Sequence, residues 1–153
     1  MIKFSKLTDY SVVVLAAMSK SDALMSAHCL AEATGLPEPT VSKVLKLLAK
    51  SCVVNSVRGV NGGYSLARGT ADINVAQIVR AIEGPVTLAT CVENSPESCG
   101  YAACCPVKGR WDAVNSVVKA ALESVSLADM IRDDYKLPNS KTTETPETQG
   151  AVQ

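Results

Sequence analysis

The sequence of 153 residues has little of what enzymes and membrane proteins usually require. It holds one histidine and 4% aromatic residues, and it shows no paired acid and base and no glycine-rich phosphate-binding loop. No apolar run approaches the roughly 18 residues that span a bilayer, and residues 1–10 lack the basic start and apolar run of a secretory signal. We therefore expect a cytoplasmic protein that is not an enzyme, has no small-molecule substrate and has no contact with a membrane.

Charge is distributed unevenly along the chain, although the net charge is zero. Residues 1–70 contain eight Lys or Arg against four Asp or Glu, a net charge of +4, whereas residues 71–153 contain seven against eleven, a net charge of −4. This asymmetry predicts that the first half faces a polyanion such as DNA.

Cysteines are frequent for a protein that is expected in the cytoplasm. In a reducing compartment, six cysteines indicate metal ligands or sensor thiols rather than a disulfide framework. Cys29 and Cys52 stand among apolar residues and are expected to pack in the core. The other four fall within fifteen residues that show no helical or strand periodicity: Cys91, Cys99, Cys104 and Cys105.

Helical periodicity and capping residues predict most of the secondary structure. The first helix is expected to be capped by Thr8 or Asp9, and two short β-prone runs flank the sequence RGVNGG, which suits a tight hairpin tip. The last long helix carries an apolar stripe expected to meet a partner subunit: Trp111, Val114, Val117, Val118, Ala121 and Leu122. The predicted helices are 8–19, 27–34, 39–51, 74–84, 107–124 and 126–131, and the predicted strands are 52–57 and 64–67.

The order of helix, turn, helix and hairpin is that of a winged helix-turn-helix protein. The second helix of this motif should bury its apolar face and present short polar and cationic side chains to DNA. We expect Thr40, Ser42 and Lys43 to reach base edges, and Lys46 to bind phosphate.

The hairpin tip carries a second set of candidate DNA contacts. Arg58, beside glycines, could enter a narrow minor groove, where negative potential is concentrated, and Asn61 could assist it. The alternative interpretation is that the lysines are an ordinary solvated helix face and the hairpin is only a hairpin.

Four segments together resemble the IscR-type regulators, the winged-helix family that also includes the nitric-oxide sensor NsrR. They are KLTDYSV, GLPEPTVSKVLKLLAKS, SVRGVNGGYSLAR and the cysteine loop, and the resemblance covers roughly residues 1 to 135. It implies a homodimeric transcription factor with a mainly α fold and a small β-hairpin, in which the state of an iron-sulfur cluster alters DNA binding.

The resemblance implies three cysteine ligands, Cys91, Cys99 and Cys105. Cys105 is preferred to its neighbour because the six-residue step from Cys105 to Trp111 matches the spacing in the family; Cys104 is then an extra thiol. The resulting pattern, C-x7-C-x5-C, is two residues longer in its first gap than the family pattern.

A fourth ligand is also implied. The position of the IscR histidine is Lys108, which is usually protonated and a poor ligand. Asp9 matches the aspartate that reaches the other subunit's cluster in the NsrR branch, so Asp9 is the preferred fourth ligand, with helix capping as its alternative role.

Several alternatives remain at the cysteine loop. Three cysteines and an aspartate suit either a two-iron or a four-iron centre (2Fe-2S or 4Fe-4S), and they could also hold zinc. Two of the thiols could instead form a disulfide on oxidation, with Cys104 as the resolving partner. A rival from another class is a small iron-sulfur carrier or electron-transfer protein.

The expected organisation combines a winged helix-turn-helix domain with a long C-terminal dimerisation helix. The function expected is control of iron-sulfur cluster assembly or stress genes in response to cluster status, or to an oxidant or nitric oxide acting on the cluster. The expected parts are a DNA-binding domain over 1–84, a cluster-binding loop over 85–106, a dimerisation helix with a short final helix over 107–135, and a disordered tail over 136–153.

Overall fold

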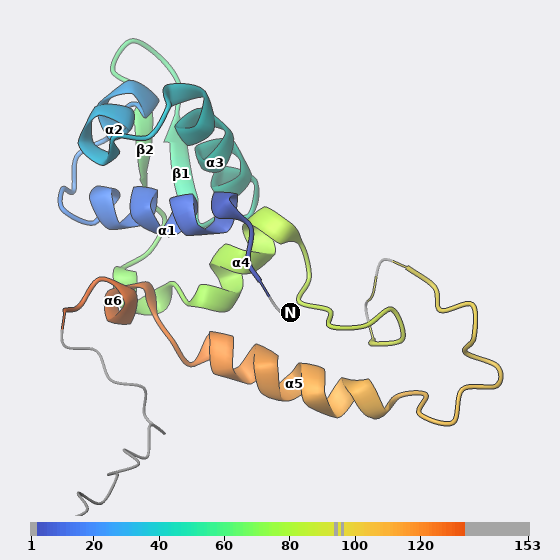
Figure 1. The fold of residues 1–153 in the computed structure, drawn as a ribbon. Helices are drawn as coiled ribbons and strands as arrows, with labels where there is room; N and C mark the ends of the chain where they lie inside the picture. The colour runs from blue at the N-terminus through green and yellow to red at the C-terminus, as the bar shows by residue number, and fades with distance from the viewer. Residues whose placement is uncertain (1–2, 94, 96, 134–153) are drawn as a thin grey trace, which may run out of the picture.

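The structure, a computed structural model, describes residues 3–93, 95 and 97–133. The tail expected over 136–153 lies outside these residues. Within them the fold is mainly helical with one antiparallel two-stranded hairpin, as predicted (Figure 1). The elements are α1 (Lys6–Met18), α2 (Ala27–Thr34), α3 (Glu38–Lys50), β1 (Val54–Val57), β2 (Gly63–Leu66), a 3₁₀ turn (Thr70–Asp72), α4 (Val75–Glu83), α5 (Arg110–Glu123) and α6 (Leu127–Met130).

Helix α1 is the centre of the domain, and its start differs from the prediction. Ser5 is the N-cap: its hydroxyl accepts a hydrogen bond from the backbone N–H of Thr8 at 3.3 Å. Thr8 and Asp9 therefore lie inside the first turn, and the prediction that one of them caps the helix is wrong. The observed cap lies one turn before the predicted one, because the hydroxyl of Ser5 can already accept the hydrogen bond that a cap residue must accept.

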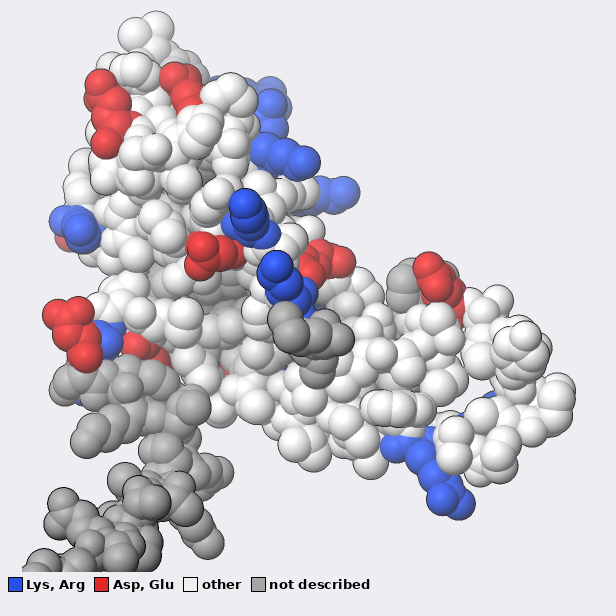
Figure 2. All heavy atoms as spheres, viewed as in Figure 1, with Lys and Arg blue, Asp and Glu red and all other residues white. Residues whose placement is uncertain are grey.

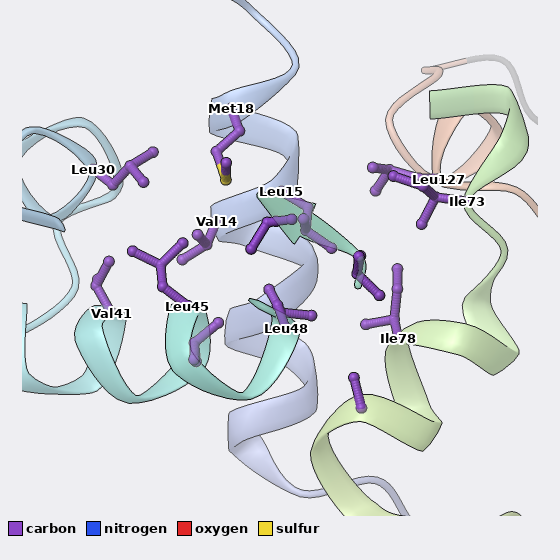
Figure 3. Packing of buried hydrophobic residues seen from close by; sticks show 14 residues of the cluster. Val14, Leu15, Met18, Leu30, Val41, Leu45, Leu48, Ile73, Ile78 and Leu127 are labelled. Carbon is purple, nitrogen blue, oxygen red and sulfur yellow. The ribbon is translucent and has the colours of Figure 1, made fainter. Parts of the chain in front are cut away.

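The core lies between α1 and the elements on both sides of it. In Figure 1, α2, α3 and the hairpin lie on one side of α1, and α4 and α6 lie on the other. Figure 3 shows the buried side chains meeting from both directions, with Leu45 and Leu48 of α3 near α1 and with Leu127 of α6 beside Ile73. The backbone N–H of Leu127 donates to the carbonyl of Ile73 at 2.6 Å, so the short last helix is attached to the same core.

The helix-turn-helix follows its predicted signals closely. Ser26 caps α2, and Gly35 ends it in the left-handed conformation with φ of 72°. Helix α3 starts at Glu38 directly after Pro37, and it buries its apolar face as predicted; the buried residues are Val41, Val44, Leu45 and Leu48.

The hairpin depends on a glycine at one position. Strands β1 and β2 pair in antiparallel register from Val54 opposite Leu66 to Val57 opposite Gly63. A Cβ atom on Gly62 would lie 2.3 Å from the carbonyl oxygen of Val57, so no larger residue fits at this position without moving the strand end. Gly59 has φ of 119°, which also favours glycine.

Cys29 and Cys52 are exposed, and the prediction that they pack in the core is wrong. Helix α2 is only eight residues long and buries Leu30 alone, which leaves Cys29 on its outer side. Cys52 lies in the turn after α3 with φ of 56°, and Val53 occupies the buried position instead.

Helix α5 exposes four residues of its predicted apolar stripe, whereas Val118 and Leu122 are half-buried. Gly109, in a left-handed conformation, delays the start of the helix to Arg110, three residues later than predicted. The exposed fractions are 45% for Trp111, 46% for Val114 and 70% for Val117. None of the described helices combines the length and the apolar character needed to cross a membrane.

Candidate DNA-binding surface and cysteine loop

One face of α3 presents the residues predicted to read DNA. Ser42, Lys43 and Lys46 line a shallow surface hollow together with Pro39 and Leu47, on the side of the helix away from the core. Thr40 lies in the first turn of the same helix and is half-buried. The spacing of i, i+3 and i+4 along α3 explains why these residues share one face.

The cations on this face are available to an external partner. Lys43 and Lys46 are exposed, and within the described part of the chain neither ammonium group forms a salt bridge. Figure 2 shows Lys and Arg side chains gathered beside α3, with acidic side chains on the neighbouring part of the domain. This arrangement can bind the phosphates of a DNA backbone.

The wing places Arg58 and Asn61 at the tip of the hairpin. Both side chains are exposed, and the tip is closed by a hydrogen bond from the backbone N–H of Gly62 to the carbonyl of Gly59 at 3.0 Å. Val60, between the two polar residues, is fully exposed and was not among the predicted site residues. The tip therefore presents three side chains that make little contact with their own domain.

His28 connects the two helices of the helix-turn-helix. Its Nδ1 lies 3.0 Å from Oε2 of Glu38 at the start of α3, and its Nε2 lies 3.6 Å from Oε1 of Glu32. The hydrogen bond with Glu38 and then the charge of Glu32 raise the pKa of His28 above its ordinary value of 6.5. Because all three groups are exposed, this contact contributes little to stability.

The cysteine loop runs from Gly84 to Gly109, and its described residues form turns but no helix or strand. Cys91, Cys99 and Cys105 are half-buried, Cys104 is exposed, and the thiols of the described cysteines are free. Among the described residues, no three His, Cys, Asp or Glu side chains lie close enough together to hold a metal ion. The structure thus does not bring Cys91, Cys99 and Cys105 together in one chain, and it does not bring Asp9 to them.

The donors are nevertheless of the right kind for iron or zinc. Three free thiols lie on turn backbone, where no helix or strand hydrogen bonding has to be broken for them to converge. The backbone N–H of Lys108 donates to the carbonyl of Cys105 at 3.4 Å, so Lys108 lies in the same turn as the last candidate ligand. The exposed position of Asp9 on α1 is compatible with a contact to another subunit.

The first part of the loop is attached to α5. The backbone N–H of Leu88 donates to Oδ1 of Asn115 at 3.0 Å, and that of Glu93 donates to Oδ1 of Asp112 at 2.9 Å. The attached segment borders a hollow of about 700 Å³ between α4 and α5. The sequence analysis did not select Asn115 or Asp112, although their spacing of three on an amphipathic helix places them on one face.

The start of the loop is also connected to α1. The carboxylate of Glu83, at the end of α4, accepts hydrogen bonds from the hydroxyl of Thr8 and, at 2.8 Å, from the backbone N–H of Ser5. These hydrogen bonds, with that of Thr8 the strongest influence, hold the pKa of Glu83 below its ordinary value of 4.5. The contact fixes the end of α4 beside the turn of α1 that carries Asp9.

Comparisons with known proteins agree with this geometry. The HTH-type transcriptional regulator NsrR of Oceanobacillus iheyensis is 26% identical over 89% of this chain and 94% of its own. Among solved structures, CymR, the global cysteine regulator of B. subtilis, matches with a TM-score of 0.63 and 25% identity over 86% of this chain and 97% of its own. T. potens IscR matches with a TM-score of 0.61 and 30% identity, over 86% of this chain and 88% of its own.

A family model described as "Rrf2: Iron-dependent Transcriptional regulator" matches residues 4–133, which is most of the chain. The family and its structures confirm the predicted winged-helix fold and the resemblance to the IscR and NsrR regulators. They also agree with the prediction of a transcriptional regulator rather than an enzyme. The chain therefore belongs to the Rrf2 family of transcriptional regulators.

Proposed function

We propose that this regulator is a cytoplasmic homodimer that senses the status of an iron-sulfur cluster, or an oxidant or nitric oxide acting on that cluster. Its targets are genes of iron-sulfur cluster assembly or of the stress response. The observation that carries the proposal is the set of free thiols of Cys91, Cys99 and Cys105 on turn backbone, in a chain whose recognition helix presents two exposed lysines that form no salt bridge with a described residue.

Operator binding is assigned to α3 and the wing. Ser42 and Lys43 contact base edges in the major groove, together with Thr40 in the first turn, while Lys46 binds a phosphate. Arg58 and Asn61, at the exposed wing tip, contact the adjacent minor groove.

Dimerisation is assigned to the exposed face of α5. A partner with an apolar surface is needed because Trp111, Val114 and Val117 leave a row of apolar side chains in contact with water. A second copy of α5 is the natural occupant, since two such helices bury the same stripe against each other. The two recognition helices of the dimer must then lie about 34 Å apart to meet successive half-sites.

Metal binding is assigned to Cys91, Cys99 and Cys105, with Asp9 of the other subunit as fourth ligand. A bound iron-sulfur cluster supplies a centre that reacts with oxidants and nitric oxide. The oxygen ligand is harder than thiolate and holds iron less firmly, which makes the centre easier to displace. A two-iron and a four-iron centre both fit this ligand set.

The chain's own contacts suggest how the loop affects DNA binding. Asp112 and Asn115 attach the loop to α5, and Glu83 attaches its start to α1. A change in the loop therefore acts on both the helix assigned to dimerisation and the first helix of the DNA-binding domain. We describe the outcome as a population shift between dimers with different spacing of the recognition helices.

The test is anaerobic purification of the full chain, with a near-ultraviolet and visible absorption spectrum and assays of iron, sulfide and zinc on one sample. A brown protein with matching iron and sulfide is the expected result. A protein that stays colourless after reconstitution with iron and sulfide would overturn the cluster and leave the family's DNA binding in place.

A second candidate is a zinc-based or thiol-based redox regulator of the same fold. It is favoured by the exposed thiol of Cys104, next to Cys105, and by the likeness to CymR, a global cysteine regulator. Zinc in the same assay, or a disulfide that forms in air, would support it. An iron-sulfur carrier is separated by titrating random duplex DNA at two salt concentrations, because only the regulator binds with a steep salt slope.

A further inference from the structure

We propose that Asp112 and Asn115, on α5, are positioning residues that hold Cys91 of the loop in a fixed position relative to that helix. The proposal rests on the assignment of Cys91 as a metal ligand. The two side chains stand three residues apart and each accepts one backbone hydrogen bond from the loop, from Leu88 to Asn115 and from Glu93 to Asp112. We call this pair of contacts the clasp.

Cys91 lies between the two clasped residues. It is three residues after Leu88 and two residues before Glu93, so the backbone on both sides of its thiol is attached to the same face of one helix. With both ends of a six-residue segment fixed, the position of Cys91 relative to α5 is restricted.

Burial shows that the Asn115 contact of the clasp is part of the packed structure, whereas the hydrogen bond from Glu93 to Asp112 is exposed. Asn115 is 8% exposed, one of the few buried polar residues of the described chain, and Val92 beside Cys91 is 5% exposed. A buried amide on an otherwise exposed helix needs a partner, and the backbone of the loop supplies it. Ser116, the next residue of α5, is exposed and its hydroxyl donates only to the carbonyl of Asp112 within the helix.

Among the described residues, Cys99 and Cys105, the other two candidate cysteine ligands, have no such attachment. The backbone bonds around Cys99, Cys104 and Cys105 are local turns, such as that from Ala102 to the carbonyl of Cys99 at 3.2 Å. Among described residues, no hydrogen bond joins 97–106 to a residue outside the loop. Figure 1 shows the chain after α4 running beside α5 and then extending past the start of that helix.

The loop thus has one fixed thiol and two that are placed only by local turns. Cys91 is the preset member of the ligand set, and Cys99 and Cys105 come to it when a metal binds. Groups that orient a ligand commonly affect metal affinity by about 10-fold to 100-fold when they are removed. Asp112 and Asn115 have this role through backbone hydrogen bonds rather than by touching the metal.

The first readout uses the full chain, reduced and free of metal. In Asn115→Ala the amide of Leu88, and in Asp112→Ala the amide of Glu93, should lose about tenfold in protection from hydrogen exchange. Alkylation of Cys91 by iodoacetamide, located by mass spectrometry, should become several-fold faster, whereas alkylation of Cys104 should not change. Asn115→Asp, which keeps the acceptor oxygen, should restore both values, and Ser116→Ala is the matched control.

The second readout is titration of the same proteins with Co²⁺ alone, followed by thiolate-to-cobalt absorption. Both alanine variants should bind Co²⁺ about tenfold more weakly than the wild type, and Ser116→Ala should bind as the wild type does. Unchanged exchange and alkylation in the alanine variants would overturn the clasp. Faster exchange with unchanged Co²⁺ affinity would overturn its positioning role.

The two proposals can fail separately. A wild-type protein that gives no thiolate-to-cobalt absorption would contradict the metal site of the proposed function. The alkylation rates of Cys91 and Cys104 would still decide whether the clasp fixes Cys91.

Discussion

The hydroxyl of Thr8, in the first turn of α1, donates a hydrogen bond to the carboxylate of Glu83, the last residue of α4. These residues are 75 positions apart in the sequence. The bond joins the place where the cysteine loop begins to the turn of α1 that carries Asp9. The start of one subunit's cysteine loop is therefore attached to the helix that carries the same chain's Asp9, the residue proposed as a ligand in the other subunit's site.

Replacing Glu83 tests this connection through pH. Hydrogen bonds from Thr8 and Ser5 lower the pKa of Glu83, so its ionised form stabilises the folded protein above its ordinary pKa of 4.5, and this contribution is lost as the pH falls through the lowered value. Glu83→Gln keeps an acceptor oxygen but removes the charge. We expect a loss of about 1 kcal/mol in unfolding free energy at neutral pH, discounted for exposure, and little difference in acid.

Urea denaturation at neutral pH and at a series of acid pH values, from the ordinary pKa of 4.5 downwards, measures this difference. Thr8→Val, which removes the donor without touching the carboxylate, should give a similar loss at neutral pH. A Glu83→Gln protein whose stability falls with acid as steeply as that of the wild type would contradict the assignment.

Lys46 is predicted to neutralise one phosphate. Lys46→Ala should weaken binding to all duplex sequences and lower the slope of log affinity against log salt concentration by about 0.9. Fluorescence anisotropy with random duplex DNA at several salt concentrations gives the slope. Lys119→Ala, on α5 beside Glu123, is the matched control and should leave the slope unchanged.

Arg58 is predicted to read the minor groove from the wing. Arg58→Ala should weaken binding by about tenfold at operators with an A-tract beside the half-site, because a narrow groove concentrates negative potential. It should change binding much less when the A-tract is replaced by mixed sequence. Competition binding with the two duplexes measures the ratio, and an equal loss on both would make Arg58 a phosphate contact.

The assignment of ligands in the loop depends on which of two adjacent cysteines is used. Cys105→Ala should abolish cluster binding, whereas Cys104→Ala should leave it largely intact, because neighbouring side chains tend to point apart. Asp9→Ala should allow a cluster to form that is lost faster in air. Iron and sulfide content after anaerobic reconstitution, and the decay of visible absorption, give these values; reversed cysteine results would shift the ligand by one position.

The exposed face of α5 is predicted to form the dimer. Val117→Asp places a charge in the middle of the apolar stripe and should weaken dimerisation by about 3 kcal/mol, since a carboxylate is costly to bury without a partner. Light scattering during size-exclusion chromatography should show a monomer. Ser116→Asp adds the same charge one residue away from the stripe and should leave the dimer intact, whereas a Val117→Asp protein that stays dimeric would assign the interface to another surface.

The sequence was most informative where a helix has both an apolar face and a capping residue. The apolar face of α3 and the bounds of α2, α4 and α6 to within one residue at most ends were predicted, because capping and periodicity are local properties of a few consecutive residues. The start of α1 was placed too late, because Thr8 and Asp9 stand next to the apolar run and are plausible caps, whereas Ser5 lies one turn before them.

The errors and omissions concern exposure and long-range contacts. Cys29 and Cys52 have apolar neighbours in sequence, but neighbours along a short helix or a turn do not share its buried side. Glu83 and Asn115 were missed because their partners lie 75 and 27 residues away. No periodic signal marks such pairs, and only the folded chain brings them together.

The clash at Gly62 has a consequence for how relatives of this protein can diverge. The close approach to the Val57 carbonyl fixes the shape of the wing at Gly62, whereas the side chains of Val60 and Asn61 are exposed. Substitutions at 60 and 61 are therefore open to selection for new operator sequences without loss of the fold. With the tip contacting the operator as proposed, mutational drift at positions 60 and 61 would alter the set of regulated genes while the hairpin stays the same.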